Sequence, residues 1–207
     1  INDALVIDNT GAFTTEEALK RHMTSPGVEK VLLTAPGKGV PNIVYGVNHE
    51  DFNPDDVTIF SAASCTTNAI TPVLAVIEET LGVVKGHIET IHAYTNDQNL
   101  IDNIHKGDRR GRAAGMNMVM TETGAAKAVS KAIPSLEGKL SGSAIRVPVI
   151  NVSIAVLSLN LKTASSVEEI NQLLKAASTR AELTGQIGYS DCADAVSSDF
   201  IGSQQAG

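Results

Sequence analysis

The sequence contains no tryptophan and has few aromatic residues of any kind. Phe and Tyr together make up 3% of its 207 residues, whereas 43% are hydrophobic. A core must therefore rest on Val, Ile, Leu and Ala, and the length suffices for one large domain or for parts of two. No apolar run reaches about 18 residues, so we expect no membrane-spanning helix and no membrane partner.

The sequence also lacks an excess of basic over acidic residues. The chain has 16 Lys and Arg against 23 Asp and Glu, which gives a net charge of −7 at pH 7. Nucleic-acid-binding domains usually carry the opposite imbalance, so we expect no nucleic-acid partner. Only two cysteines occur, a usage that is typical of a cytoplasmic protein and argues against a disulfide framework. We expect no metal site.

The first 64 residues have the pattern of an α/β domain. The predicted elements are short apolar strands at 4–8, 30–34, 43–47 and 57–60 and a helix over 14–24. Thr14 and Glu17 have the spacing of a capping box at the start of that helix. Because strand, helix and strand form the unit of a parallel sheet, residues 1–64 are predicted to hold part of such a sheet.

From residue 65 the pattern changes to long strands covered by helices. The predicted elements are helices over 65–80, 121–132 and 166–178, a strand over 83–95 and a strand region over 144–161 interrupted at Pro148. Ser166 and Glu169 form a second capping box. The aperiodic segment 96–120 is predicted to be a long loop, and such loops are usually functional. We therefore expect an α+β domain with a mainly antiparallel sheet over 65–207.

Cys65 is the first candidate for chemistry. It lies where a short strand gives way to a helix, so free backbone N–H groups and the positive end of the helix dipole can stabilise its thiolate. This position favours a nucleophilic cysteine with a lowered pKa. The alternative is a small buried thiol near a helix cap, because free cysteines are among the most buried residues.

His92 is the natural base for this thiol. A helix that begins at Cys65 can return the chain, and a strand running back would bring His92 near the sulfur. A strand histidine that is merely half-buried explains the same spacing equally well. His87 and His105 are competitors, although His87 lies on the opposite strand face and His105 lies in the charged loop.

Several elements of the second half are suited to anions. Residues 105–112 carry four positive charges and one negative charge, and Arg residues there can grip a phosphate with paired hydrogen bonds. The segment 121–124 offers hydroxyls and N–H groups ahead of a helix, and Arg146 is a charge inside an apolar strand. A solvated face, an ordinary helix cap and a structural carboxylate partner are the plainer interpretations. Together with the thiol, these elements indicate a covalent enzyme acting on a small phosphorylated carbonyl compound.

These residues closely resemble the glyceraldehyde-3-phosphate dehydrogenase family, in order and spacing and over essentially the whole chain. The matching stretches are Ser64–Asn68, His92–Gln98, Arg109–Ala114, Thr121–Val129, Arg146–Pro148 and Asn151–Ser153. The resemblance implies that Cys65 attacks the aldehyde of glyceraldehyde 3-phosphate and that His92 activates the thiol and takes the hydroxyl proton. It also implies that Thr95 and Arg146 bind the substrate phosphate. The residues implied for the attacking inorganic phosphate are Ser64, Thr66, Thr123, Gly124 and Arg110.

The resemblance further implies a nicotinamide cofactor, NAD or NADP. Asn9, Thr10 and Gly11 match a turn beside the dinucleotide, and Thr34 matches a position near the nicotinamide. The domains would then be a partial Rossmann-type dinucleotide-binding domain over 1–64 and a C-terminally incomplete catalytic domain over 65–207. A homotetramer is implied, with the loop 96–120 packed at a subunit interface.

The family's Gly-rich fingerprint and its C-terminal motif have no counterpart in this sequence. We therefore interpret the chain as a fragment of a longer protein, which by itself could be inactive. Within the family, an erythrose-4-phosphate dehydrogenase shares the same functional residues. Outside it, the residues alone also permit a cofactor-free Cys–His hydrolase or acyltransferase, and an inactive binding role is a third interpretation.

Overall fold

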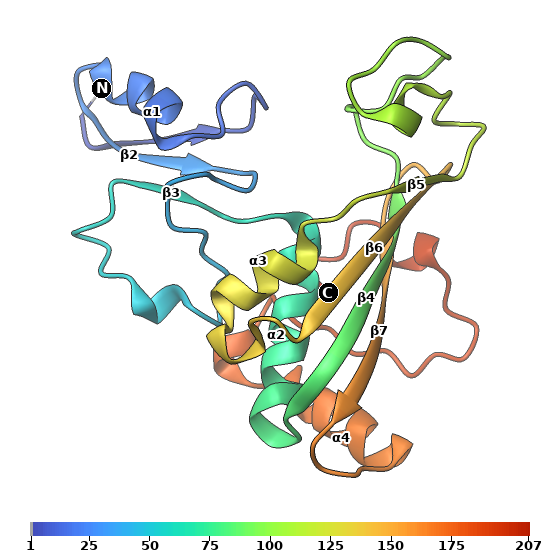
Figure 1. Ribbon diagram of the computed structural model, residues 1–207. Coiled ribbons are helices and arrows are strands. Elements are labelled where there is room, and N and C mark those ends of the chain that lie inside the picture. The colour runs from blue at the N-terminus through green and yellow to red at the C-terminus, as the bar shows by residue number, and fades with distance from the viewer. Residues whose placement is uncertain (1) are drawn as a thin grey trace.

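The computed structural model describes residues 2–207, and it contains two separate sheets. The first is a parallel sheet with the strand order β1-β2-β3, at the blue end of the chain in Figure 1. Its strands are β1 (Ala4–Asp8), β2 (Val28–Leu33) and β3 (Ile59–Ser61). The prediction of a partial parallel sheet in the N-terminal part of the chain is confirmed.

A short helical segment covers one face of this sheet. It consists of α1 (Glu16–Leu19) and a 3-10 turn over Lys20–Thr24. Leu19 is fully buried against Val31, Leu33 and Ile59. Burial of these branched side chains, which alternate along the strands, is what holds the helix on the sheet.

Two local predictions in this half are wrong. The helix is capped by Thr15, whose hydroxyl accepts from the Ala18 N–H, because the Thr14 carbonyl is already bonded to Lys38. Residues 43–47 form no strand, because the Asn48 side chain accepts from the Val44 N–H and a turn follows. The apolar run is explained instead by the burial of Val44, which is 1% exposed.

The second sheet has the strand order β5-β6-β4-β7. Its strands are β4 (Val83–Ala93), β5 (Val119–Thr121), β6 (Leu140–Val147) and β7 (Ser153–Leu161). The pairs β5–β6 and β4–β7 are antiparallel, whereas β4 and β6 are parallel. The predicted α+β arrangement with a mainly antiparallel sheet is confirmed, with one parallel pair at its centre.

Helices cover one face of this sheet and leave the other face open (Figure 1). They are α2 (Cys65–Thr80), α3 (Ala125–Ala132) and α4 (Val167–Ala177). The core between α2, α3 and the sheet contains Leu74, Ile88 and Val129, all fully buried. The predicted helix over 121–132 begins later, because Thr121 is paired to β6 as the end of β5. No helix within residues 2–207 has the length and apolar character to cross a membrane.

The loop between β4 and β5 forms a lobe of its own, drawn in green at the top of Figure 1. It carries large apolar side chains that are largely exposed, including Leu100, Ile104, Met116 and Met118. Ile154 and Val156 on the open face of β7 are also exposed, at 51% and 44%. Apolar side chains thus gather on the loop and on the open sheet face.

Candidate active site

A strained turn between β3 and α2 presents Cys65. Ala63 has φ +59°, a left-handed conformation that non-glycine residues rarely adopt. The Asn68 side chain holds this turn by donating to the Ala62 and Ser64 carbonyls at 2.7 and 2.8 Å. Cys65 follows directly as the first residue of α2 and is exposed. The thiol therefore lies at a helix N-terminus, as the sequence predicts, and it is open to solvent.

Cys65 and His92 form a pair. The Cys65 Sγ lies 3.5 Å from the His92 Nε2. The hydrogen bond to His92 lowers the pKa of Cys65 from 9.0 to about 7, and the contact with Cys65 raises the pKa of His92. The opposite shifts favour a thiolate beside an imidazolium.

The Ala93 carbonyl orients the imidazole. The His92 Nδ1 lies 2.6 Å from this oxygen, which can only accept, so Nδ1 carries a proton and Nε2 faces the sulfur. The competing histidines make other contacts: both ring nitrogens of His87 bond to serine hydroxyls of β6, and His105 bonds to Gly107. Among the histidines considered from the sequence, His92 is the one the fold places at the thiol.

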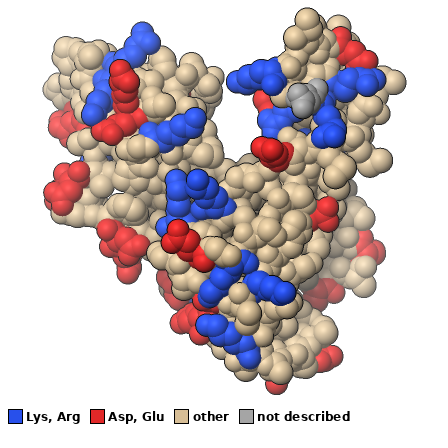
Figure 2. Space-filling view, viewed as in Figure 1, with Lys and Arg blue, Asp and Glu red and all other residues tan. Residues whose placement is uncertain are grey.

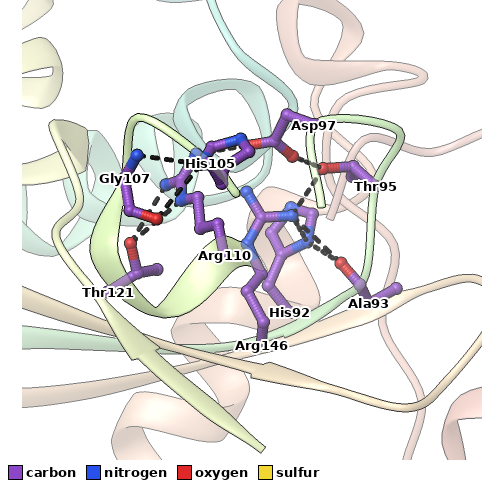
Figure 3. A network of polar contacts seen from close by, with 9 residues as sticks. All are labelled: His92, Ala93, Thr95, Asp97, His105, Gly107, Arg110, Thr121 and Arg146. Carbon is purple, nitrogen blue, oxygen red and sulfur yellow. Dashed lines mark hydrogen bonds and ion pairs between the residues drawn. The ribbon is translucent and has the colours of Figure 1, made fainter. Parts of the chain in front are cut away.

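Two arginines from different elements lie beside His92 (Figure 3). Arg146 on β6 is paired in register with His92, and its Nη1 donates to the Thr95 hydroxyl at 2.8 Å and the Ala93 carbonyl at 3.2 Å. Arg110 comes from the loop, and its Nε and Nη2 donate to the Thr121 hydroxyl at 3.2 and 3.1 Å. The structure thus brings Thr95, Arg146 and Arg110 together beside His92.

Sequence reasoning assigned no role to Asp97, and it considered Thr121 only as part of a segment suited to anions. Asp97 accepts from both Thr95 and Arg110, and Thr121 fixes the Arg110 guanidinium. Asp97 lies inside the matching stretch His92–Gln98, and this was the available signal. The contact of Thr121 with Arg110 could not be predicted this way, since it depends on the pairing of β5 with β6.

The other predicted anion-binding residues lie at helix starts. The Ser64 hydroxyl caps α2 by accepting from the Thr67 N–H at 3.0 Å, and it also bonds to the Thr67 hydroxyl. The Thr123 hydroxyl accepts from the Ala125 N–H at 3.2 Å, and Gly124 is the N-cap residue of α3. Thr66 follows Cys65 and contributes hydrogen bonds that lower the pKa of the thiol. These hydroxyls already have partners within the chain.

Lys and Arg side chains gather on the loop lobe, beside a hollow that separates it from the parallel-sheet lobe (Figure 2). The side chains of Lys106, Arg109 and Arg112 are exposed there, and that of Arg110 is half-buried. Ser64 and Gly124 also line a groove of about 280 Å³ between the segment 36–44 and the helices α2 and α3, together with Lys38 and Lys127. The positive charges on the loop lobe and in this groove are therefore suited to anionic ligands.

The residues predicted for the cofactor lie at the carboxyl ends of the parallel strands. The buried Asp8 carboxylate accepts from the Thr10 N–H and hydroxyl at 2.9 and 2.8 Å. The Thr34 N–H donates to the Asp8 carbonyl at 3.0 Å. Gly11 has φ +73°, and no other residue lies within 4 Å of where its Cβ would be. Asn9, which lies between Asp8 and Thr10, is exposed. This edge of a parallel sheet is where α/β folds bind dinucleotides.

Comparison with known proteins decides the family. A family model described as "Glyceraldehyde 3-phosphate dehydrogenase, C-terminal domain" matches residues 64–207. The chain belongs to the glyceraldehyde-3-phosphate dehydrogenase family. This membership covers the thiol, the histidine and both arginines.

Three relatives show the extent of the similarity within the glyceraldehyde-3-phosphate dehydrogenase family. A protein of Pseudomonas aeruginosa named glyceraldehyde-3-phosphate dehydrogenase-like is 55% identical over 208 residues, which cover 100% of this chain and 45% of that protein. The Zymomonas mobilis glyceraldehyde-3-phosphate dehydrogenase is 46% identical over 95% of this chain and 58% of its own length. The chloroplastic glyceraldehyde-3-phosphate dehydrogenase A of Zea mays is 47% identical over 95% of this chain and 48% of its own length. The chain thus spans about half the length of the curated relatives it matches.

Proposed function

We propose that the protein to which this chain belongs oxidises glyceraldehyde 3-phosphate to 1,3-bisphosphoglycerate with inorganic phosphate and NAD or NADP. The observation that carries the proposal is the Cys65–His92 pair at 3.5 Å, with Arg146 and Arg110 beside His92. Family membership and the names of the relatives support the same reaction class.

Cys65 begins the proposed reaction. Its thiolate attacks the aldehyde carbon, and the resulting oxyanion takes the proton of the His92 Nε2 to give a thiohemiacetal, which leaves the imidazole neutral. The Cys65 N–H at the start of α2 and the His92 side chain are the donors available for the oxyanion. Because the pKa of the thiol is about 7, roughly half of it is ionised at neutral pH without a further base.

His92 moves the proton in the second step. Its Nε2 takes the hydroxyl proton of the thiohemiacetal as the carbon is oxidised, and the product on Cys65 is a thioester. The nicotinamide ring, when bound, supplies the hydride acceptor for this step. Inorganic phosphate then attacks the thioester carbon, the Cys65 sulfur leaves as a thiolate, and an acyl phosphate is released.

The flanking residues bind the two phosphates in this proposal. Thr95 and Arg146 hold the phosphate carried by the aldehyde, because they are joined to each other and adjoin His92. Arg110 holds the attacking phosphate, with Ser64, Thr66, Thr123 and Gly124 contributing hydroxyls and N–H groups at two helix starts. Arg146 is half-buried, which strengthens its attraction for an anion.

The residues at the edge of the parallel sheet fit a dinucleotide. The open space at Gly11 and the fixed Thr10 hydroxyl leave room and a hydrogen-bonding group beside the turn 9–11, and Thr34 extends this edge. We infer that residues 1–64 contribute to a dinucleotide-binding domain and that residues 65–207 belong to the catalytic domain. Neither NAD nor NADP is favoured by these residues.

We further infer a homotetramer. The exposed apolar residues of the loop and of the open β7 face support this proposal, because such residues are better explained by subunit interfaces than by solvated faces. A cytoplasmic location stays a prediction from cysteine usage, and the name of the Zea mays relative places that protein in the chloroplast.

The proposal is tested on the full-length protein. NAD or NADP reduction is measured with glyceraldehyde 3-phosphate and with erythrose 4-phosphate, each with and without inorganic phosphate. Cys65→Ser should abolish the reaction and Cys192→Ser, the control, should leave it unchanged. Reduction that is faster with erythrose 4-phosphate and independent of phosphate would favour the erythrose-4-phosphate enzyme. Thioester hydrolysis without any nucleotide reduction would favour a Cys–His hydrolase.

A further inference from the structure

Asp8 lies at the end of β1 and contacts both segments that are proposed to meet the dinucleotide. Its carboxylate Oδ1 accepts from the Thr10 N–H and hydroxyl at 2.9 and 2.8 Å. Its main-chain carbonyl accepts from the Thr34 N–H at 3.0 Å and from the Thr34 hydroxyl at 3.3 Å. One residue therefore joins the turn 9–11 to the residue that follows β2, at the edge of the parallel sheet.

The Thr10 hydroxyl connects Asp8 to the rest of the turn. It donates to the Asp8 carboxylate and accepts from the Ala12 N–H at 3.1 Å. Because a hydroxyl has a single proton, the bond to Asp8 fixes its rotation and directs its lone pairs toward Ala12. The conformation of the turn 9–12 thus depends on where the Asp8 Oδ1 lies.

His22 holds the other oxygen of this carboxylate. Asp8 is ionised at neutral pH, since burial raises its pKa but the hydrogen bonds from His22 and Thr10 outweigh burial and lower it. An ionised carboxylate can only accept, so the His22 Nε2, which lies 2.7 Å from the Asp8 Oδ2, is the donor. The two oxygens are therefore held from opposite sides, one by the turn and one by the helical segment over Lys20–Thr24.

Phe13 fixes the imidazole. The rings of Phe13 and His22 meet edge to face, with their centroids 5.5 Å apart, and Phe13 packs against the core of the parallel sheet. The His22 side chain is only 26% exposed, and the Asp8 side chain is fully buried. The imidazole is thus anchored to the sheet, and it sets the rotation of the carboxylate.

We propose that His22 is a positioning residue that acts through Asp8 to orient the Thr10 hydroxyl and the turn 9–12 for the dinucleotide. The proposal rests on the proposed function. Because the Asp8 side chain is fully buried, it acts on a bound dinucleotide only through the turn. Without His22, one oxygen of a buried carboxylate loses its hydrogen bond, and the side chain rotates or admits water to replace it. The turn then loses its fixed orientation.

Two substitutions of His22 in the full-length protein test this role. His22→Leu removes the donor, whereas His22→Gln keeps one, because the Gln side-chain amide can donate to the same oxygen. The dissociation constants for NADH and NADPH are measured from the fluorescence of the reduced nicotinamide. In His22→Leu they should rise about three- to tenfold, the range that one net hydrogen bond contributes, and in His22→Gln they should stay within about twofold. At saturating dinucleotide, the kcat should change by less than about twofold in either variant.

His49→Leu is the matched control. His49 is half-buried like His22 and accepts a hydrogen bond from the Gly46 N–H at 3.1 Å, but it belongs to a different loop. Its substitution should leave the binding of both nucleotides unchanged. Weaker binding in His49→Leu, of the same size as in His22→Leu, would overturn the proposal, since the effect would then not be specific to the Asp8 contact.

A double substitution tests the route through Thr10. Thr10→Val removes the hydroxyl but leaves the contact between Asp8 and His22. It should weaken dinucleotide binding by itself, and His22→Leu in this background should add less than about twofold, because both changes act through the same hydroxyl. Effects that multiply fully would show that His22 does not act through Thr10, which contradicts the proposal.

Hydrogen exchange provides a measurement without dinucleotide. The Thr10 and Ala12 amides are hydrogen-bonded within the turn, so the peptide that contains residues 9–12 should exchange faster in His22→Leu and at the original rate in His22→Gln. The peptide of β2 should keep its protection in both variants. If β2 loses its protection as well in His22→Leu, His22 stabilises the sheet as a whole and the positioning role is wrong.

The outcomes separate this role from the proposed function. Equal dinucleotide binding by His22→Leu and the unsubstituted protein, or no recovery of binding in His22→Gln, would overturn the positioning role alone. If the unsubstituted protein binds neither NADH nor NADPH, the proposed cofactor site is wrong and this role fails with it. If the protein binds dinucleotide and shows the expected shifts but oxidises no aldehyde, the proposed reaction fails and the positioning role stands.

Discussion

His92 on β4 and Arg146 on β6 are paired in register on adjacent parallel strands, and the Arg146 Nη1 lies 3.3 Å from the His92 Nδ1. The two side chains extend from the sheet toward the same end of α2. This pairing places a permanent positive charge beside the imidazole, and that charge lowers the pKa of His92 against the larger effect of Cys65. The register of one strand pair therefore sets the electrostatics of the candidate site.

The pH dependence of thiol labelling is the first expectation. Iodoacetamide reacts with the thiolate, so the labelling rate of Cys65 should reach half of its plateau at about pH 7. Below that pH the rate should fall as the sulfur is protonated. Mass spectrometry of the Cys65 peptide provides the rate at each pH. A rate that still climbs steeply between pH 8 and pH 9 would contradict a thiolate stabilised by His92.

His92→Asn should slow this labelling. Removing the imidazole takes away the hydrogen bond that is the main cause of the lowered thiol pKa, so the rate at pH 7 should fall by on the order of tenfold. In the full-length protein, aldehyde oxidation should fall by a factor on the order of 10² to 10⁴. His87→Asn on the opposite face of the same strand is the control and should change neither rate. Equal labelling of both variants would count against the pair.

Asp8→Asn should destabilise the fold. The Asp8 side chain is fully buried and accepts from Thr10 and His22, so the variant should lose about 1–3 kcal/mol in free energy of unfolding at pH 7. Urea denaturation followed by circular dichroism provides this value. Glu29→Gln, an exposed carboxylate on β2, is the control with the same charge change.

The effect of Asp8 should depend on pH in one direction. Burial raises its pKa, but hydrogen bonds from His22 and Thr10 outweigh this and place the folded pKa below 3.8. A lowered folded pKa means that the stabilisation is complete well above pH 3.8 and is lost as the pH falls through the folded value. The stability difference between Asp8→Asn and the unsubstituted chain should therefore narrow below pH 4. A difference that stays constant from pH 7 to pH 3 would show that the charge contributes nothing.

Ala63→Val should disrupt the turn that presents the thiol. A β-branched residue is strongly disfavoured at φ +59°, so the variant should be destabilised by about 1–3 kcal/mol and Cys65 labelling should slow. Ala63→Gly is the matched control, since glycine adopts this conformation freely and should keep both stability and labelling. If the valine variant matches the glycine variant, the left-handed turn has no role in placing Cys65.

Local signals in the sequence predicted the elements that depend on neighbouring residues. The capping box of Ser166 and Glu169 is present at the start of α4, and the strand–helix junction places Cys65 at the start of α2. The strand predicted over 43–47 does not form, because the Asn48 side chain accepts a hydrogen bond from the Val44 N–H and a turn follows. Apolar content alone predicts burial and not strand pairing.

Long-range pairings limited the prediction of the site. The spacing of Cys65 and His92, with one helix and one returning strand between them, allowed the pair but did not decide it, and the resemblance to the family favoured it. Arg146, in contrast, reaches His92 through a parallel register that no local pattern specifies, and the contacts of Asp97 depend on how the long loop folds back. For these residues the sequence predicts the kind of ligand but not the partners within the chain.

The parallel pairing of β4 with β6 also affects how the protein reaches its folded state. It joins residues that are 54 positions apart, whereas the thiol and the imidazole are 27 apart. Contacts between distant segments form slowly during refolding, because the entropy of closing a long loop is lost before these contacts contribute favourable free energy. During folding, Cys65 should therefore pair with His92 before Arg146 reaches its place. In a refolding experiment, fast labelling of Cys65 by iodoacetamide should appear earlier than the protection of Cys65 by inorganic phosphate.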